Sequence, residues 1–391
     1  MIDRSHLMGT YPEPPVNFVE GRGTVLIDED GREYLDFLCG LAVTSLGHCH
    51  PAVAEAVASQ ARTLEHVSNL FGTPQGPVAA DLIDALLFDA TGHHGKVFFT
   101  NSGAESNECA IKLARKASPD RYRIVTTLDS FHGRTLATLA ATGQRAKQVA
   151  FDPMPEGFTH VSYGDIDALR AELDVGDVAG VLLEGIQAEG GVNVPPSGYL
   201  EAVARACSDS GSLLLLDEVQ TGLGRTGQWF SFMDEGVVPD IVTLAKALGN
   251  GYPVGACWAK DEVAEVFVPG DHGTTYGGQP VAMAAVRATL ETMIDLDAPA
   301  CAARASRRLA DGLLDLEGVV SVRGRGLLLG AVLDEARAAA VVTNALARGL
   351  VVNAVRPDVV RLTPPLTVRD EEIDEALRRF GAALNATQGA H

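Results

Sequence analysis

The middle of the chain alternates short apolar runs with stretches of helical periodicity, from about residue 95 to residue 260. Apolar runs of this length, flanked by turn residues, predict strands that are buried on both faces. Such strands, joined by helices, are typical of a mostly parallel sheet in an α/β domain. The predicted strands are 97–100, 123–127, 179–184, 213–219, 241–245 and 255–259, and the predicted helices between them include 106–117 and 198–210.

The two ends of the chain have a different pattern. Residues 16–40 predict a short hairpin that turns at Glu29-Asp30-Gly31. A long helix is expected from about Pro280, and after it the C-terminal third mixes helices with short strands at 327–333 and 359–364. We therefore expect a large domain over residues 51–285 and a smaller α+β domain built from residues 1–50 and 286–391.

Composition narrows the class of protein. The 391 residues are 46% hydrophobic and 21% charged, which is enough to bury a large core. The net charge of −20 is spread along the chain and argues against nucleic acid or an anionic membrane as a partner. The N-terminus has no signal-peptide core, and no segment approaches the uncharged span of about 20 residues that crosses a bilayer.

The cysteines and histidines do not form a metal-binding pattern. The six cysteines are scattered without a C-x-x-C pair, and we expect reduced thiols in a cytoplasmic protein. His48-Cys49-His50 and His93-His94 are the nearest candidates for metal ligands, but no partner cluster with ligand spacing follows either of them. We expect no metal.

Polar residues stand where several predicted strands end. The run at 97–100 is followed by Asn101-Ser102-Gly103-Ala104, which opens a helix, and free N–H groups at a helix start form an anion site. Asp217 follows four leucines, and Lys246 ends another apolar run. Taken singly, Ser102 is an ordinary N-cap and Lys246 an ordinary surface lysine. Ligands of open α/β sheets, however, collect at the carboxyl ends of the strands.

Together these residues suit pyridoxal phosphate. Its phosphate requires an anion site, its pyridinium nitrogen requires a carboxylate, and its aldehyde requires a lysine that can form a Schiff base. Burial and a nearby cationic cofactor would lower the pKa of the Lys246 amine and make it a usable nucleophile and base.

A glycine pattern suggests a different cofactor. Residues 222–227, GLGRTG, match the dinucleotide fingerprint G-x-G-x-x-G, which would indicate an NAD-dependent oxidoreductase. The context does not fit, because the polar segment DEVQT separates the strand from the glycines. The nearest acidic residue, Asp240, also precedes the next strand, whereas the acid that binds the ribose should follow it.

Five motifs, in order, carry a family resemblance: TNSGAESNE, FHGRTLA, LLLLDEVQTGLGRTG, TLAKALGNG and HGTTYGGQP. From about Tyr11 to the region of Leu362 the chain resembles class III aminotransferases, and within that class the acetylornithine aminotransferases. The resemblance implies the fold type I architecture of pyridoxal-phosphate enzymes, which is like that of aspartate aminotransferase. It also implies a homodimer with active sites at the subunit interface.

The resemblance also implies roles for residues that bind the cofactor. Lys246 would hold the cofactor as a Schiff base and move protons, and Asp217 would keep the ring nitrogen protonated. The other expected cofactor contacts are Gly103 and Ala104 (phosphate), Phe131 (stacking on the ring), Val219 (lining the cofactor site), Gln220 (ring hydroxyl) and Thr275 (phosphate, from the other subunit).

Four further residues would bind the substrates. Arg134 would bind the substrate α-carboxylate, and Thr274 would touch the substrate across the interface. Glu189 and Arg361 would form a switch pair, in which Arg361 pairs with Glu189 when an amino substrate binds and is released for the second carboxylate of 2-oxoglutarate.

The resemblance implies transfer of the δ-amino group of N2-acetyl-L-ornithine to 2-oxoglutarate, as in arginine biosynthesis. The products would be N-acetyl-L-glutamate 5-semialdehyde and L-glutamate. Leu41 stands where ornithine aminotransferases of this class carry tyrosine, and an apolar residue suits an acylated ornithine. One alternative is a related ω-aminotransferase, of primary or specialised metabolism, whose amino donor is succinylornithine, ornithine or another diamine or ω-amino acid. The other is an interaction protein without catalysis.

The chain also departs from the family pattern. Gly185 and Ala188 replace residues of a typical E-P-I-Q-G-E, Gln279 replaces an asparagine, and GNG at 249–251 replaces a triple glycine. We expect Gly185 to loosen the backbone below the site.

Overall fold

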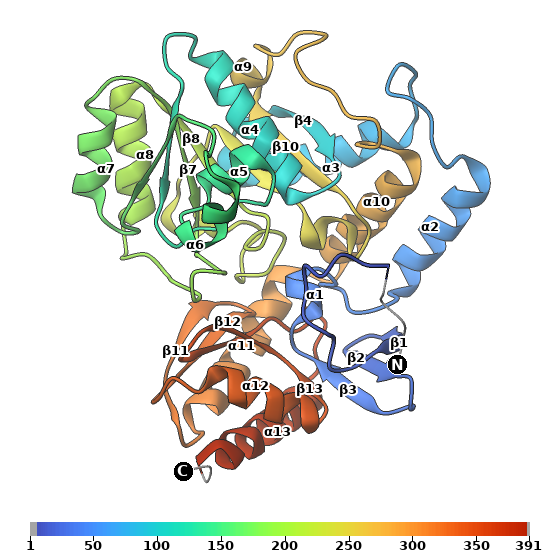
Figure 1. The fold of residues 1–391 in the computed structure, drawn as a ribbon. Helices are drawn as coiled ribbons and strands as arrows, with labels where there is room; N and C mark the ends of the chain where they lie inside the picture. Colours follow the sequence, from blue (N-terminus) through green and yellow to red (C-terminus); the bar gives the residue numbers. More distant parts are fainter. Residues whose placement is uncertain (1–5, 389–391) are drawn as a thin grey trace.

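The computed structural model describes residues 6–388 and is built around a seven-stranded sheet (Figure 1). Strands β5 to β9 pair in parallel, whereas β10 runs antiparallel to both β9 and β4. The predicted α/β fold with a mostly parallel sheet is therefore confirmed. In spatial order the strands are β4 (Gly95–Thr100), β10 (Gly255–Lys260), β9 (Ile241–Leu244), β8 (Leu213–Asp217), β7 (Val178–Glu184), β5 (Arg123–Thr127) and β6 (Phe158–Val161).

Strand β6 has no counterpart among the predicted strands, and β8 ends at Asp217, two residues before the predicted end of that strand. The residues of β6, FTHV, mix polar and apolar side chains at the sheet edge, so they lack the continuous apolar run of the inner strands. Beyond Asp217 the chain turns, because the Asp217 carboxylate accepts a hydrogen bond from the backbone N–H of Val219 at 3.1 Å.

Both faces of this sheet are buried, as the apolar runs require. Leu214 and Leu216 of β8 belong to one hydrophobic core, while Leu215 belongs to a second core on the opposite face. Successive side chains of a strand point to opposite faces, so a run of consecutive leucines serves both cores. Helix α4 (Gly103–Ala117) supplies the second core, and Leu169 of α7 and Val203 of α8 lie in the first.

Helices surround the three sheets, and some of the segments are only one turn long. The longer helices are α2 (Pro51–Thr63), α3 (Gln75–Thr91), α7 (Ile166–Leu173), α8 (Tyr199–Ser210), α10 (Pro280–Asp295), α11 (Ala298–Leu314), α12 (Ala338–Ala347) and α13 (Asp370–Gln388). The shorter segments are α1 (Cys39–Ala42), α5 (Leu136–Ala141), α6 (Arg145–Gln148) and α9 (Asp261–Ala264), with 3₁₀ turns at η1 (Val149–Phe151), η2 (Ser231–Glu235) and η3 (Lys246–Gly249). Within the described range no helix is both long and apolar enough to cross a membrane.

The two chain ends lie together below the central sheet (Figure 1). The expected N-terminal hairpin forms and pairs with a strand from the C-terminal third, because Leu350 and Val351 lie parallel to β3. The first small sheet consists, in spatial order, of β1 (Phe18–Arg22), β2 (Val25–Asp28), β3 (Glu33–Asp36) and β13 (Leu350–Val351). The second consists of β11 (Val319–Arg325), β12 (Leu328–Leu333), β15 (Val359–Leu362) and β14 (Asn353–Arg356). The domain limits near residues 50 and 285 stay a prediction.

The glycine-rich segment 222–227 connects the central sheet to the part of the chain below it. The fully buried guanidinium of Arg225 donates to the carbonyls of Leu327 (3.1 Å) and Pro364 (2.5 Å) and to the Ser45 hydroxyl (2.9 Å). Burial lowers the pKa of Arg225 to about 10. Gly224 and Gly227 have φ angles near +90°, which glycine adopts without strain. These glycines therefore form a packed turn between the large and small parts.

Candidate active site

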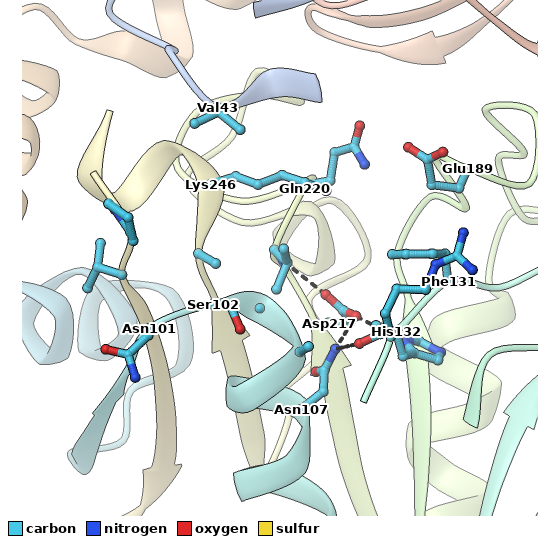
Figure 2. A pocket seen from close by; sticks show the side chains of 18 of the residues that line it. Val43, Asn101, Ser102, Asn107, Phe131, His132, Glu189, Asp217, Gln220 and Lys246 are labelled. Carbon is cyan, nitrogen blue, oxygen red and sulfur yellow. Dashed lines mark hydrogen bonds and ion pairs between the residues drawn. The ribbon is translucent and has the colours of Figure 1, made fainter. Parts of the chain in front are cut away.

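A cavity of about 380 Å³ lies at the carboxyl ends of the central strands (Figure 2). It is lined by residues that follow β4, β7, β8 and β9, which are far apart in sequence. The cavity contains most of the predicted site residues: Gly103, Ala104, Phe131, Arg134, Glu189, Asp217, Val219, Gln220 and Lys246.

The start of helix α4 forms one wall of the cavity. Ser102 is its N-cap, and the Ser102 hydroxyl accepts a hydrogen bond from the Glu105 N–H at 3.3 Å. A side chain at position 103 would collide with Val219, whose Cγ1 lies 2.8 Å from where a Cβ would be. Gly103 is therefore required for close packing. The N–H groups in the first turn of a helix are of the kind that binds an anion.

Asp217 lies on the cavity floor and accepts hydrogen bonds from three groups. The Val219 N–H bonds Oδ1, while the Asn107 amide and the ring nitrogen Nδ1 of His132 each lie 2.8 Å from Oδ2 (Figure 2). All three stabilise the ionised carboxylate. Asp217 is only 4% exposed, so these donors replace the water that a buried carboxylate lacks.

Lys246 begins the 3₁₀ turn η3 directly after β9 and extends its side chain into the cavity (Figure 2). Burial lowers the pKa of its amine, while nearby Glu189 raises it and Arg361 lowers it. The backbone at Lys246 has a φ of +42°, a left-handed conformation that is strained for a non-glycine residue. The lysine is thus held in an unusual conformation at the centre of the site.

Glu189 and Arg361 meet at the far side of the cavity. Arg361 Nη1 lies 2.5 Å from Glu189 Oε1, and the guanidinium is fully buried. Burial opposes the charge of Glu189, but Arg361 prevails and lowers the pKa of that carboxyl. The predicted pair is therefore present as an ion pair.

Two buried polar atoms support a polar ligand in this cavity. Gln220 Oε1 and His132 Nε2, both of residues that line the cavity, have no hydrogen-bond partner within residues 6–388. Arg361 Nη2 is also without a partner there, although Arg361 is not part of the lining. Buried polar groups are almost always paired, so such orphans at a cavity indicate a ligand. A carboxylate, a helix start and an amine line the cavity together with the unpaired Gln220 oxygen, and these groups fit the polar groups of pyridoxal phosphate.

Thr274 and Thr275 do not line this cavity. They lie in a neighbouring hollow with Phe98, Lys112 and His272. Asn101 borders both hollows, and its amide lies 3.4 Å from the Thr274 hydroxyl. Leu41 also lies outside the described lining, whereas Val43 contributes to it.

Three buried polar residues of the site were not singled out from the sequence: Asn107, His132 and Glu184. Glu184 pairs with Asp217 across β7 and β8, and burial together with Asp217 raises its pKa well above the usual value. The sequence signal that could have identified Glu184 is its position, because it is a carboxylate at the end of the apolar run 179–184. Asn107 and His132 lie within the quoted motifs, but their spacing does not reveal that they contact Asp217.

The expectation that Gly185 loosens the backbone stays a prediction, and the structure shows how the position is packed. The Tyr163 hydroxyl donates to the Glu184 carbonyl at 2.8 Å and lies 3.0 Å from the Gly185 carbonyl. A Cβ at position 185 would lie 2.0 Å from the Ser231 hydroxyl, which itself donates to buried Glu218 at 2.6 Å. The space that a larger residue would fill is therefore occupied by Ser231.

Two further sequence features concern metal-binding residue types and the cysteines. No group of three or more His, Cys, Asp or Glu residues in the described part of the chain has the arrangement of a metal site. The six cysteines are all free.

Comparison with known proteins gives a single family. The model of the family "Aminotransferase class-III" matches residues 9–384. The acetylornithine aminotransferase of Corynebacterium efficiens is 49% identical over 97% of this chain and 94% of its own length. That of Mycolicibacterium smegmatis is 47% identical, over 97% of this chain and 96% of its own.

Solved structures of aminotransferases have a similar fold. The ornithine aminotransferase of Toxoplasma gondii ME49 has a TM-score of 0.93 at 33% identity and covers 100% of this chain and 94% of its own. The N-acetylornithine aminotransferase of Stenotrophomonas maltophilia has a TM-score of 0.85 at 37% identity, with 97% and 98% covered.

Proposed function

Because this chain belongs to the class-III aminotransferase family, a family that uses pyridoxal phosphate, we propose that it acts on N2-acetyl-L-ornithine and 2-oxoglutarate. It transfers the δ-amino group to 2-oxoglutarate and yields N-acetyl-L-glutamate 5-semialdehyde and L-glutamate. The observation that carries this proposal is that the chain is 47–49% identical to acetylornithine aminotransferases over 97% of its length. The proposed setting is arginine biosynthesis in the cytoplasm.

The first group of residues would hold the cofactor. When bound, pyridoxal phosphate supplies an electron-withdrawing ring that stabilises negative charge on the carbon bearing the amino group. Asp217 would hold a proton at the ring nitrogen, and the N–H groups of Gly103 and Ala104 would bind the phosphate. Phe131 and Val219 line the cavity where the ring would lie, and the unpaired Gln220 amide would bind its hydroxyl.

Lys246 would supply the covalent attachment and then move the proton. Burial lowers the pKa of its amine, so a larger fraction is unprotonated and able to accept a proton near neutral pH. Asp217 and Glu184 lie on the neighbouring strands, and both line the cavity with Lys246. Walls formed by Val43, Val219 and Val254 would exclude water from the lysine amine.

Two arginines would bind the substrate carboxylates. Arg134 lines the cavity and forms no ion pair with any residue of the described chain, so its guanidinium is available for a carboxylate. It lies 5.6 Å from the Phe131 ring centroid, which restrains its position. Arg361 would remain paired with Glu189 for the amino donor and bind the second carboxylate of 2-oxoglutarate.

We also propose that two chains form a homodimer that shares its sites. Thr274 and Thr275 lie outside the cavity of their own chain, which suits contacts to the substrate and the phosphate of a second copy. Large apolar side chains are exposed near that hollow, namely Leu70 (86%), Phe71 (69%) and Tyr276 (58%). The backbone carbonyls of Thr274 and Gly277 accept from the Asn69 amide, so these segments are neighbours.

A substrate panel tests the function. Purified protein loaded with pyridoxal phosphate is assayed with acetylornithine, succinylornithine and ornithine, each with 2-oxoglutarate. We expect acetylornithine to give the highest kcat/KM. A tenfold preference for another donor would assign the chain to that substrate, and the lack of a visible cofactor band would overturn the cofactor role as well.

A further inference from the structure

Asn107 is a buried amide beside the proposed cofactor site whose hydrogen-bonding groups are all used. It lies in the first turns of α4 and is 1% exposed. Its Nδ2 donates to Asp217 Oδ2 and to the His132 carbonyl, each at 2.8 Å, and its Oδ1 accepts from the Thr243 hydroxyl at 2.7 Å. The two amide protons and the carbonyl oxygen are therefore committed to three different segments. Figure 2 shows Asn107 beside Asp217 and His132.

Thr243 anchors the oxygen of this amide. It lies on β9 with its side chain fully buried, and its hydroxyl is the group that bonds Asn107 Oδ1. If the amide were flipped, its oxygen would face the Asp217 carboxylate and the His132 carbonyl, and all three groups are acceptors. The flip would also leave buried acceptors without donors, which is costly. The Asp217 carboxylate and the His132 carbonyl therefore set the orientation of the amide, and the Thr243 hydroxyl anchors its oxygen so that an N–H group stays against Asp217.

The charge of Asp217 has a competitor on the adjacent strand. Glu184 and Asp217 are register partners at the ends of β7 and β8 and are 5% and 4% exposed. Asp217 receives three donors, whereas Glu184 receives one, the Phe131 N–H at 3.0 Å. Two neighbouring buried carboxyls do not both ionise readily, and the better solvated one carries the charge. Lys246, Glu189 and His132 are the other titratable groups that face this pair.

Building on the proposed cofactor role of Asp217, we propose that Asn107, anchored by Thr243, is a positioning residue that keeps the negative charge on Asp217 rather than on Glu184. The anion then lies where it can hold the proton of the ring nitrogen. Without the oriented amide, Asp217 keeps two donors, the charge is shared with Glu184, and the ring nitrogen is less well protonated.

The test uses Thr243→Val, which is nearly isosteric, and Asn107→Leu. Thr126→Val is the matched control, because Thr126 is fully buried in β5 and its hydroxyl donates to the Ala141 carbonyl at 2.7 Å, away from Asp217. Three quantities are measured: the dissociation constant of pyridoxal phosphate, the pH midpoint of the visible band of the lysine-bound cofactor, and the Tm of the cofactor-free protein.

We expect Asn107→Leu to weaken cofactor binding about tenfold, which is the effect of one lost hydrogen bond to a charged group, and Thr243→Val to weaken it less. The pH midpoint should rise in both variants, because a less positive ring nitrogen lets the nitrogen of Lys246 keep its proton to higher pH. Thr126→Val should lower Tm without changing the dissociation constant of pyridoxal phosphate or the pH midpoint of the visible band. Adding Glu184→Gln to Asn107→Leu should recover binding, since the charge then has to remain on Asp217.

The outcomes separate this inference from the function on which it rests. If the unmodified protein binds no pyridoxal phosphate, the proposed function fails. If it binds, but Asn107→Leu and Thr243→Val change only Tm, as Thr126→Val does, Asn107 is merely structural and the inference is overturned. Lack of recovery by Glu184→Gln would overturn the competition between the two carboxyls.

Discussion

Arg361 and Glu189 form a buried ion pair beside the cavity that contains Lys246, with Nη1 and Oε1 2.5 Å apart. The guanidinium also lies 3.3 Å from Asn353 Oδ1 through Nε, while Nη2 has no partner among residues 6–388. A buried cation with one unpaired N–H group and an exchangeable carboxylate partner is suited to bind a second carboxylate.

The two arginines should therefore affect the half-reactions differently. Both substrates carry a carboxylate at the end distant from the reacting group, so Arg134→Ala should slow both halves. Arg361→Ala should mainly slow the 2-oxoglutarate half, which presents a second carboxylate. Loss of one carboxylate–guanidinium pair between substrate and protein should weaken the affected half-reaction by about 2–5 kcal/mol. Single-turnover spectroscopy follows each half separately, and equal slowing of both halves by Arg361→Ala would contradict the switch.

Lys246 should be the covalent anchor of the cofactor. We expect Lys246→Ala to abolish transamination, because no other amine lines the described cavity, while pyridoxal phosphate can still bind through the first turn of α4. Borohydride reduction of the loaded wild type followed by peptide mapping locates the modified lysine. Finding the cofactor on a different lysine would refute the assignment.

Asp217 should act through its charge and not its shape. Asp217→Asn keeps the volume but cannot hold a proton at the ring nitrogen, so we expect a loss of roughly 3 kcal/mol in transition-state stabilisation. The measurement is kcat/KM for both half-reactions. Turnover close to that of the wild type would remove Asp217 from its proposed role.

Glu218 should make stability depend on pH. Burial raises its pKa to about 7, although hydrogen bonds from Ser231 and Thr221 lower it. The folded state therefore binds the proton of the Glu218 carboxyl more tightly than the unfolded state does. The stabilisation from this proton is complete below about pH 4.5 and is lost as pH rises through 7. The difference is about 3 kcal/mol, since one pKa unit corresponds to about 1.4 kcal/mol.

Glu218→Gln removes this titration. Its free energy of unfolding should fall less than that of the wild type between pH 5 and pH 8, as measured by urea denaturation. Parallel pH profiles for the two proteins would show that Glu218 titrates normally in the folded state.

Gly185 and Ser231 should be coupled. Gly185→Ala places a methyl group against the Ser231 hydroxyl and should destabilise the protein by about 1–3 kcal/mol. Ser231→Ala removes that hydroxyl, so in its background Gly185→Ala should cost less. Urea denaturation of both single variants and the double variant gives the coupling energy, and additive effects would show that the two positions are independent.

Six of the seven strands of the central sheet, and the chemistry of the main site residues, were predictable from the sequence alone. Apolar runs such as 213–216 can only be strands buried on both faces, and the carboxyl ends of parallel strands meet at one edge. Lys246 and Asp217 were therefore predictable as neighbours, and the family followed from ordered motifs. The predicted roles of the site residues stay predictions, as does the division into domains.

The contacts that hold those residues depend on the fold. The amide of Asn107 and the hydroxyl of Thr243 are separated by 136 positions, and no local pattern shows that they form a hydrogen bond. Residues 222–227 match a nucleotide-binding fingerprint, yet in the fold Arg225 bonds carbonyls of distant segments. Periodicity reports which face of an element is buried, whereas the hydrogen-bond partner of a buried polar group depends on which segments the packing brings within about 3 Å.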